Sequence, residues 1–200
     1  MVAINLSQAF AVTLINPGFN DQSGWATDND AVLGNPGGVA PWEWVTPVVA
    51  SVVVQSSETV LPFEGTGMGL TYAGLDSFKQ IVNIPTPGEY EFSIYANALS
   101  GDTNFGATLV NGRFVFLAGG AQSPNMTVAT VNGWEKFSWT TFLDAGNQVI
   151  GIENNLAASY AIAYDSASLK STVIPIPAAA WLFGSAMLGL IGYSRRKCQS

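Results

Sequence analysis

The chain has 200 residues, of which 10% are charged, and it contains no histidine and one cysteine, Cys198. The lack of histidine excludes Ser-His-Asp and Cys-His catalysis and histidine-bound zinc, and a single cysteine excludes an internal disulfide. Three of the seven basic residues lie at 195–197, so residues 12–174 hold four basic and fourteen acidic residues, a net charge of −10. This charge disfavours nucleic acid and anionic lipid as partners and suits neutral glycans or Ca²⁺.

Composition also bears on catalysis and on fold class. Glycoside hydrolysis needs only two carboxylates, but no spacing among the fourteen acids identifies such a pair, and we expect the protein not to be an enzyme. The 21 glycines and the 12% aromatic residues, together with abundant Asn, Ser and Thr, favour strands and turns over helices. Without the C-terminal tail about 160 residues remain, enough for one all-β domain.

Residues 1–11 begin with apolar residues and end in Ala9-Phe10-Ala11, the pattern of a signal-peptide cleavage site. The segment has no cationic start, and its apolar stretch is short. We therefore expect residues 1–11 to be the last part of a signal peptide that begins upstream and is cleaved after Ala11. The alternative is an edge strand that is retained in the mature domain.

Two tryptophans, Trp42 and Trp44, are two positions apart in the segment 41–45. On a strand this spacing places both indoles on one face. Two interpretations follow. The pair forms a carbohydrate-binding platform on which the C–H faces of a pyranose stack, or the rings fill the core, as large aromatic residues commonly do. The exposure of the two rings distinguishes these interpretations.

The clearest strand signals lie between residues 78 and 98. Residues 81–84 are mostly apolar and lead into the turn sequence Pro85-Thr86-Pro87-Gly88, after which apolar and polar residues alternate. The turn predicts a hairpin between the two strands. The alternation predicts a buried face with Tyr90, Phe92, Ile94, Ala96 and Ala98 and an exposed face with Glu89, Glu91, Ser93, Tyr95 and Asn97.

Further strands are predicted downstream. Asn111-Gly112 tolerates the two positive φ angles of a type I′ turn, so we expect a hairpin that joins 108–110 to 113–116. Alternation predicts a strand in 134–143, and Ala145-Gly146-Asn147 turns the chain into another at 149–153. Residues 160–169 form the last predicted strand.

Several of these segments resemble galactose-binding-like jelly rolls, the fold of many carbohydrate-binding modules. They are Asn16-Pro17-Gly18-Phe19-Asn20, Gln80-Ile81-Val82, Pro87 to Ala96, Trp134, and Tyr164-Asp165-Ser166-Ala167-Ser168-Leu169. The first is similar to Asn-Gly-Gly-Phe-Glu of the modules, with Pro17 in place of Gly and Asn20 in place of Glu. The resemblance runs along most of residues 14–170. It implies an antiparallel two-sheet jelly-roll sandwich over residues 12–171, with polysaccharide as partner.

The same resemblance implies a structural calcium ion. In many of these modules the ion joins the opening Phe-Glu loop to the Asp of the last strand. Carried over to this sequence, the metal ligands are Asn20 or Asp21 together with Asp165, completed by backbone carbonyls. The alternative is that Asp21 and Asp165 are turn and surface carboxylates.

The C-terminal segment 172–200 has three parts: a proline element ending at Pro177, an uncharged apolar run at 178–193, and the basic cluster Arg195-Arg196-Lys197. A helix over the 16-residue run is about 24 Å long, and the proline element extends it enough to span a bilayer. We expect one transmembrane helix at about 178–193, with the basic cluster in the cytoplasm. The alternative is a helix buried in a soluble core.

This arrangement closely resembles the PEP-CTERM sorting signal of Gram-negative bacteria, which has a Pro-x-Pro element, a short transmembrane helix and an arginine-rich tail. The matching residues are Pro175, Pro177, Arg195, Arg196 and Lys197. The resemblance implies export, transient anchoring in the inner membrane, processing by an exosortase, and a final place at the cell surface or in the extracellular matrix. Ile176 stands where the family has Glu, which bears on the processing step.

Together these observations predict an exported surface protein whose jelly roll engages exopolysaccharide without catalysis. The alternative is a structural protein that uses the same sandwich for self-association through its sheet edges. The sequence favours both over an enzyme and does not separate them.

Overall fold

Eleven strands form two antiparallel sheets in the computed structural model, which describes residues 12–15, 17–20, 42–44, 52–54, 60–71, 77–99, 112–129, 132–154 and 161–172. Phe10–Thr172 form one compact unit. The second unit comprises Met1–Ala9 and Val173–Ser200 and lies outside the described residues. Three features therefore stay predictions: the signal-peptide segment 1–11, the transmembrane helix 178–193 and the sorting signal.

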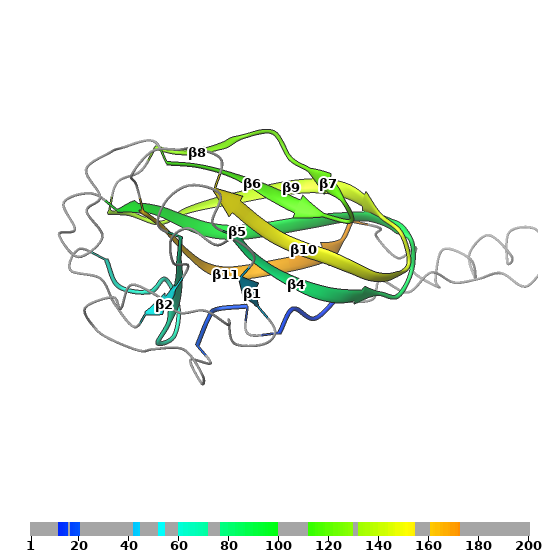
Figure 1. The fold of residues 1–200 in the computed structure, drawn as a ribbon, viewed down its shortest axis with the longest axis horizontal. Coiled ribbons are helices and arrows are strands. Elements are labelled where there is room, and N and C mark those ends of the chain that lie inside the picture. The colour runs from blue at the N-terminus through cyan, green and yellow to red at the C-terminus, as the bar shows by residue number, and fades with distance from the viewer. Residues whose placement is uncertain are drawn as a thin grey trace, which may run out of the picture. The chain divides into compact units, whose positions relative to one another are not determined.

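The strands stack as two layers (Figure 1). The strand order in the first sheet is β1 (Glu43–Trp44), β4 (Ser77–Ile84), β10 (Gly146–Asn154), β6 (Gly112–Ala118) and β7 (Ala121–Gln122), and β8 (Met126–Val128) also pairs with β6. The order in the second sheet is β2 (Val52–Val54), β3 (Met68–Thr71), β11 (Ala161–Ser171), β5 (Gly88–Leu99) and β9 (Glu135–Leu143). The prediction of an all-β protein with two antiparallel sheets is confirmed. In the part of the chain described here, no helix is both long and apolar enough to cross a membrane.

The predicted hairpin between β4 and β5 is wrong. Both strands form where expected, but β4 pairs with β1 and β10, whereas β5 pairs with β11 and β9 in the other sheet. The turn after Ile84 is therefore a corner between the sheets, and the hydroxyl of Tyr90 donates a hydrogen bond to the carbonyl of Thr86 across it at 2.8 Å. A period-two pattern fixes which face of a strand is buried but not which strand lies beside it.

The hairpin predicted around Asn111-Gly112 can be compared with the structure only from Gly112 onward, because residues 108–111 lie outside the described part. Gly112 is the first residue of β6, where it pairs with Val128 of β8. From Phe114 to Phe116, β6 pairs with β10 along one edge. Along the other edge, β8 pairs with Phe114, and Ser123 hydrogen-bonds to Phe116. The described part of β6 thus pairs with β8 and β10, and the predicted pairing with 108–110 falls outside the described residues.

The predicted faces of β5 are largely as expected. The inward residues Tyr90, Phe92 and Ile94 are at most 1% exposed, while Glu89 is exposed and Glu91 is partly exposed. Ser93 and Asn97 were predicted to be exposed but are buried, at 3% and 0%. Because β5 lies between β9 and β11 and Ser93 pairs with a serine on each side, the neighbouring strands cover its small side chain.

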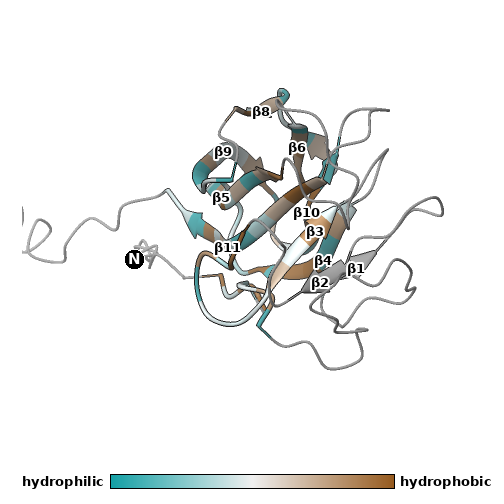
Figure 2. Ribbon diagram, turned by 90° about the vertical axis from the view of Figure 1, so that its left-hand side faces the viewer, coloured by the Kyte–Doolittle hydropathy of each residue, from teal (hydrophilic) through white to brown (hydrophobic). Residues whose placement is uncertain are grey.

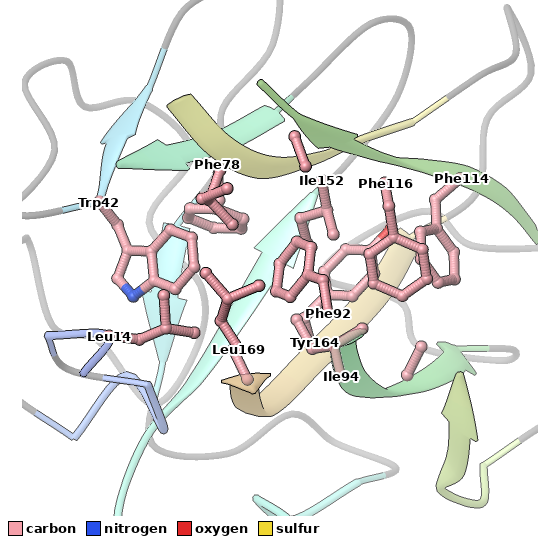
Figure 3. Close-up of a cluster of buried hydrophobic side chains, with 14 of the residues drawn as sticks. Leu14, Trp42, Phe78, Phe92, Ile94, Phe114, Phe116, Ile152, Tyr164 and Leu169 are labelled. Atoms are coloured by element: carbon pink, nitrogen blue, oxygen red, sulfur yellow. The ribbon is translucent and has the colours of Figure 1, made fainter. Parts of the chain in front are cut away.

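The main core fills the space between the sheets. Along β5 and β9 hydrophobic and hydrophilic residues alternate (Figure 2), so that the hydrophobic face of each strand points into the sandwich. Aromatic rings dominate the centre (Figure 3): Phe92 meets Phe116 edge-on at 4.8 Å between ring centroids, and Phe114 meets Tyr164 at 5.3 Å. Such edge-to-face pairs stabilise a core beyond the area they bury.

A second, smaller cluster of buried residues lies on the outer face of the second sheet. It contains Val60, Met68, Leu70, Leu99, Ala161 and Ala163, with Trp134 packed against it. Because Tyr164 points into the main core, its neighbour Ala163 points to the opposite face of β11. The segment before β3 therefore covers part of a sheet face that would otherwise meet solvent.

Candidate functional site

Trp42 is a core residue. Its side chain is 1% exposed and stacks on Phe19 with 5.3 Å between ring centroids and 22° between ring planes. It lies beside Leu14 and Phe78 (Figure 3). This placement agrees with the core alternative and removes Trp42 as a carbohydrate-binding platform. The backbone of Trp44 belongs to β1, but its side chain lies outside the described part of the structure.

A different group of aromatic residues lies on the surface, where the segment 60–67 crosses the outer face of the second sheet. Val60 and Met68, at the two ends of this crossing, are buried in the smaller cluster. Between them Leu61 is 72% exposed and Phe63 is 38% exposed. The segment is thus anchored at both ends and presents two large apolar side chains to solvent.

Phe63 packs on two aromatic residues from the sheet below. Its ring lies flat on Tyr95 of β5, with 3.8 Å between centroids and 16° between planes, and Trp134 approaches edge-on at 6.1 Å. The indole N–H of Trp134 donates a hydrogen bond to the carbonyl of Leu61 at 3.1 Å. We call Leu61, Phe63, Tyr95 and Trp134 the aromatic platform.

The sequence analysis did not identify this platform. Phe63 and Leu61 lie in a segment without strand periodicity, so no pattern marked them. Tyr95 was placed correctly on the outward face of β5. It is a large aromatic residue among polar ones on that face, and this contrast could have indicated a binding surface. Trp134 was noted because it matches a tryptophan of the carbohydrate-binding modules, but it was not assigned to a binding surface.

Asn20 and Asp165, two of the three predicted metal ligands, come together beneath the same segment. The side-chain oxygen of Asn20 accepts hydrogen bonds from the backbone N–H of Thr66 at 2.6 Å and of Gly67 at 3.1 Å. One carboxylate oxygen of Asp165 accepts from the N–H of Glu64 at 2.9 Å, and the other from the N–H of Ser166 at 2.6 Å. Asp21 lies outside the described residues.

Asp165 occupies an irregular position at which β11 shifts register against β5. The next residue, Ser166, has a φ of 49°, in the left-handed region. The carboxylate is 0% exposed. Burial raises the pKa of Asp165 to about 6, because the charged form loses its hydration; the N–H donors oppose this effect, and the nearby charge of Glu64 adds to it.

A cleft of about 580 Å³ opens beside these groups. It is lined by Ile15, Pro17, Gly18, Asn20, Glu64, Ser166 and Ala167. The hydroxyl of Ser166 donates a hydrogen bond to the carboxylate of Glu64 at 3.0 Å, so Ser166 contacts both acidic side chains. Glu64 is a member of the site that the sequence analysis missed.

Some of the oxygen-bearing side chains at this site suit a hard cation as ligands, and others do not. The carboxylates of Asp165 and Glu64 offer the oxygen ligands that Ca²⁺ prefers, and a cation would favour the charged form of the buried carboxylate. Asn20 does not suit the role of ligand, because its side-chain oxygen already accepts two N–H groups. Within the described ranges, no cluster of three or more His, Cys, Asp or Glu residues occurs.

The fold has counterparts among solved structures. The TmCBM61 module, determined in complex with β-1,4-galactotriose, is 15% identical and superposes with a TM-score of 0.57 over 80% of this chain and 98% of its own. The CBM22-1 xylan-binding domain of Paenibacillus barcinonensis Xyn10C is 15% identical, with a TM-score of 0.49 over 70% of this chain and 90% of its own. A cyclase from Fischerella sp. TAU is 12% identical, with a TM-score of 0.49 over 84% and 98%. No protein-family model matches the sequence, and no curated protein is significantly similar to it.

Proposed function

We propose that this protein is a non-catalytic carbohydrate-binding module that engages exopolysaccharide through the aromatic platform. The observation that carries the proposal is the ring of Phe63, which is supported from below by Tyr95 and is 38% exposed above. A flat, rigidly backed aromatic ring is suited to stack against the C–H face of a sugar. The jelly-roll fold, similar to that of TmCBM61, supports the same function.

Polar groups near the platform can supply the hydrogen bonds that orient a sugar. Glu64 follows Phe63 directly in the chain and lines the cleft with Asn20 and Ser166. The net charge of −10 over residues 12–174 favours a neutral polysaccharide over an anionic one. The ligand class that fits both features is an uncharged glycan with at least one exposed pyranose face.

Substitution of Phe63 tests this proposal. Wild type and Phe63→Ala are applied to a glycan array, and affinities for the glycans retained by wild type are measured by calorimetry. We expect Phe63→Ala to weaken binding at least about tenfold. Phe142→Ala is the matched control: Phe142 is 61% exposed and lies on the same face of the second sheet, about 20 Å along β9 from the residue that pairs with Tyr95. Equal affinity of Phe63→Ala and wild type would contradict the proposal.

We also propose that the two carboxylates of Asp165 and Glu64 bind a structural calcium ion. The burial of Asp165 and its proximity to Glu64 support a cation at this position. Asn20, which was carried over as a candidate ligand, is then a neighbour of the ion. The role of the ion would be to hold the segment 60–67 against β11.

The cellular route remains a proposal from the sequence. Residues 172–200 support export, anchoring in the inner membrane, processing by an exosortase, and release to the surface or matrix of a Gram-negative bacterium. A surface or matrix location would bring the aromatic platform into contact with exopolysaccharide.

A structural, self-associating protein is the second candidate. The observation in its favour is a pair of exposed apolar residues on the outer face of the first sheet, where Ile81 is 62% exposed and pairs across the strands with Val149, which is 45% exposed. Association through this face would be reduced by Ile81→Lys and measured by analytical ultracentrifugation. If the protein is a monomer at all concentrations and binds glycan, only the carbohydrate-binding function remains.

A further inference from the structure

The segment 60–67, which carries Leu61 and Phe63 of the aromatic platform, is held in its conformation by side chains from distant parts of the chain. Residues 60–67 form no regular strand or helix. The N–H of Glu64 is paired with Asp165, and those of Thr66 and Gly67 share the side-chain oxygen of Asn20. Without such partners, the conformation that places Phe63 on Tyr95 would compete with many others.

The backbone fits closely around the amide of Asn20. Gly65 has a φ of 70°, and a Cβ at this position would overlap the Asn20 side-chain oxygen. On the other side, a Cβ at Gly18 would lie 2.8 Å from the Asn20 side-chain nitrogen. Position 65 requires glycine because of its positive φ, and a side chain at position 18 would displace the amide of Asn20.

Asn20 is itself held in place by the core. The preceding residue, Phe19, is 0% exposed, stacks on Trp42 and contacts Phe78 with 5.1 Å between centroids. Its ring also covers Gly69 of β3, where a Cβ would lie 2.8 Å from it. The buried aromatic residues at 19 and 42 thus fix the backbone from which Asn20 reaches the segment.

We infer that Asn20 is a positioning residue for carbohydrate binding: its amide holds the backbone of residues 66 and 67, and thereby places Phe63 over Tyr95 in the orientation that a sugar meets. The inference rests on the proposed function. It assigns Asn20 a role separate from metal ligation, because both hydrogen bonds are made to backbone N–H groups. Asn20 itself need not touch the sugar.

Two substitutions of Asn20 test whether its acceptor oxygen holds the segment. Asn20→Ala removes the acceptor, whereas Asn20→Asp keeps an acceptor oxygen of the same size. The matched control is Asn83→Ala, which removes an exposed Asn83–Asn147 hydrogen bond of 3.1 Å in the first sheet. All proteins are studied in calcium-free buffer, so that an added carboxylate at position 20 cannot act through a bound ion.

Hydrogen–deuterium exchange of peptides covering residues 60–71 measures the positioning directly, without a glycan. We expect the amides of Thr66 and Gly67 to exchange about five- to tenfold faster in Asn20→Ala, and within about twofold of wild type in Asn20→Asp and Asn83→Ala. Exchange in β10 and β6 reports whether each variant is folded. Unchanged exchange at residues 66 and 67 in Asn20→Ala would overturn the inference.

Glycan affinity provides the second measurement. We expect Asn20→Ala to bind about three- to tenfold more weakly, because Phe63 must be ordered on binding, and Asn20→Asp to bind like wild type. Faster exchange in Asn20→Ala with unchanged affinity would overturn the positioning role. If wild type binds no glycan, the proposed function fails, and the exchange experiment alone decides whether Asn20 positions the segment.

A variant of the segment itself covers the case in which Asn20→Ala does not fold. Gly65→Ala places a methyl group against the Asn20 oxygen and should accelerate the same amides while leaving Asn20 present. Normal protection of residues 66 and 67 in Gly65→Ala would contradict the close fit on which the inference depends.

Discussion

The ring of Phe63 lies on that of Tyr95 with 3.8 Å between centroids, although the two residues come from an irregular segment and from the central part of β5. Tyr95 therefore acts as the rigid base of the aromatic platform, and Phe63 as its exposed upper surface. The proposed binding surface depends on both rings, even though Tyr95 is the less exposed of the two.

Removal of the base should affect binding as strongly as removal of the upper ring. We predict that Tyr95→Ala weakens glycan binding by about as much as Phe63→Ala and destabilises the fold by about 1 kcal/mol or more through the lost ring pair. Tyr95→Phe keeps the stacked ring and should bind like wild type. Calorimetric titration and melting curves of the three variants test this, and a loss of affinity in Tyr95→Phe would show that the hydroxyl matters instead of the ring.

The alternation along β5 predicts very different costs for neighbouring residues. Phe92 is 0% exposed and meets Phe116 in the core, so Phe92→Ala should lower the free energy of unfolding by about 3–5 kcal/mol. Glu91→Ala, on the outer face of the same strand, should change it by less than about 0.5 kcal/mol. Urea denaturation measures both values. Similar costs for the two variants would mean that the assigned faces are wrong.

The sequence predicted the faces of strands better than their neighbours. The alternation in β5 and β9 identified the residues that point into the core, because the period of two belongs to the strand itself. The partner of β4 depends instead on where the chain goes after Ile84, and a turn sequence rich in proline and glycine suits a hairpin and a corner between sheets equally. The same limit explains why the pairing of β6 with β8 and β10 was not predicted.

The site was predicted less well, for a different reason. The spacing of Trp42 and Trp44 has the same pattern in a core and on a binding face, and only the packing of Phe19 on Trp42 shows that this ring is buried. The resemblance to the modules pointed to Asn20 and Asp165 as metal ligands, and in the structure both side chains accept hydrogen bonds from the segment 60–67. Phe63 and Glu64 could not be found, because their positions depend on hydrogen bonds that an irregular backbone donates to these two side chains.

The raised pKa of Asp165 makes a pH-dependent contribution to stability. The pKa rises from 3.8 to about 6 on folding, so the folded state binds this proton more tightly than the unfolded state. The resulting stability is fully present below pH 3.8 and is lost as the pH rises through about 6, an effect of up to about 3 kcal/mol. In calcium-free buffer, wild type should therefore lose stability relative to Asp165→Asn between pH 4 and pH 7. Denaturation curves with Asp144→Asn as an exposed control test this, and a constant difference between the two proteins would refute it.

Calcium should act on the same carboxylate in the opposite direction. Because the ion favours the charged form of Asp165, we predict that calcium at one hundred times its Kd raises the melting temperature at pH 7.5 by about 5–10 °C relative to excess chelator. Asp165→Ala should abolish the shift, Glu64→Gln should reduce it, and Asp144→Asn should leave it unchanged. Identical midpoints of wild type with calcium and with chelator would end the calcium proposal.

The C-terminal segment predicts a mature protein that is shorter than the chain. Pro175 and Pro177 fix the backbone φ and disfavour helix in the residues before them, so residues 174–177 should be extended and accessible to a cleaving enzyme next to the membrane. We predict that the protein isolated from its own host ends at residues 175–177 and lacks the cluster at 195–197. Expression in a host without an exosortase should retain Ser200 and an anchored chain. Intact-mass measurement distinguishes the two forms. An uncleaved C-terminus in a host that contains the processing enzyme would mean that Ile176, in place of the family's Glu, prevents recognition of the signal.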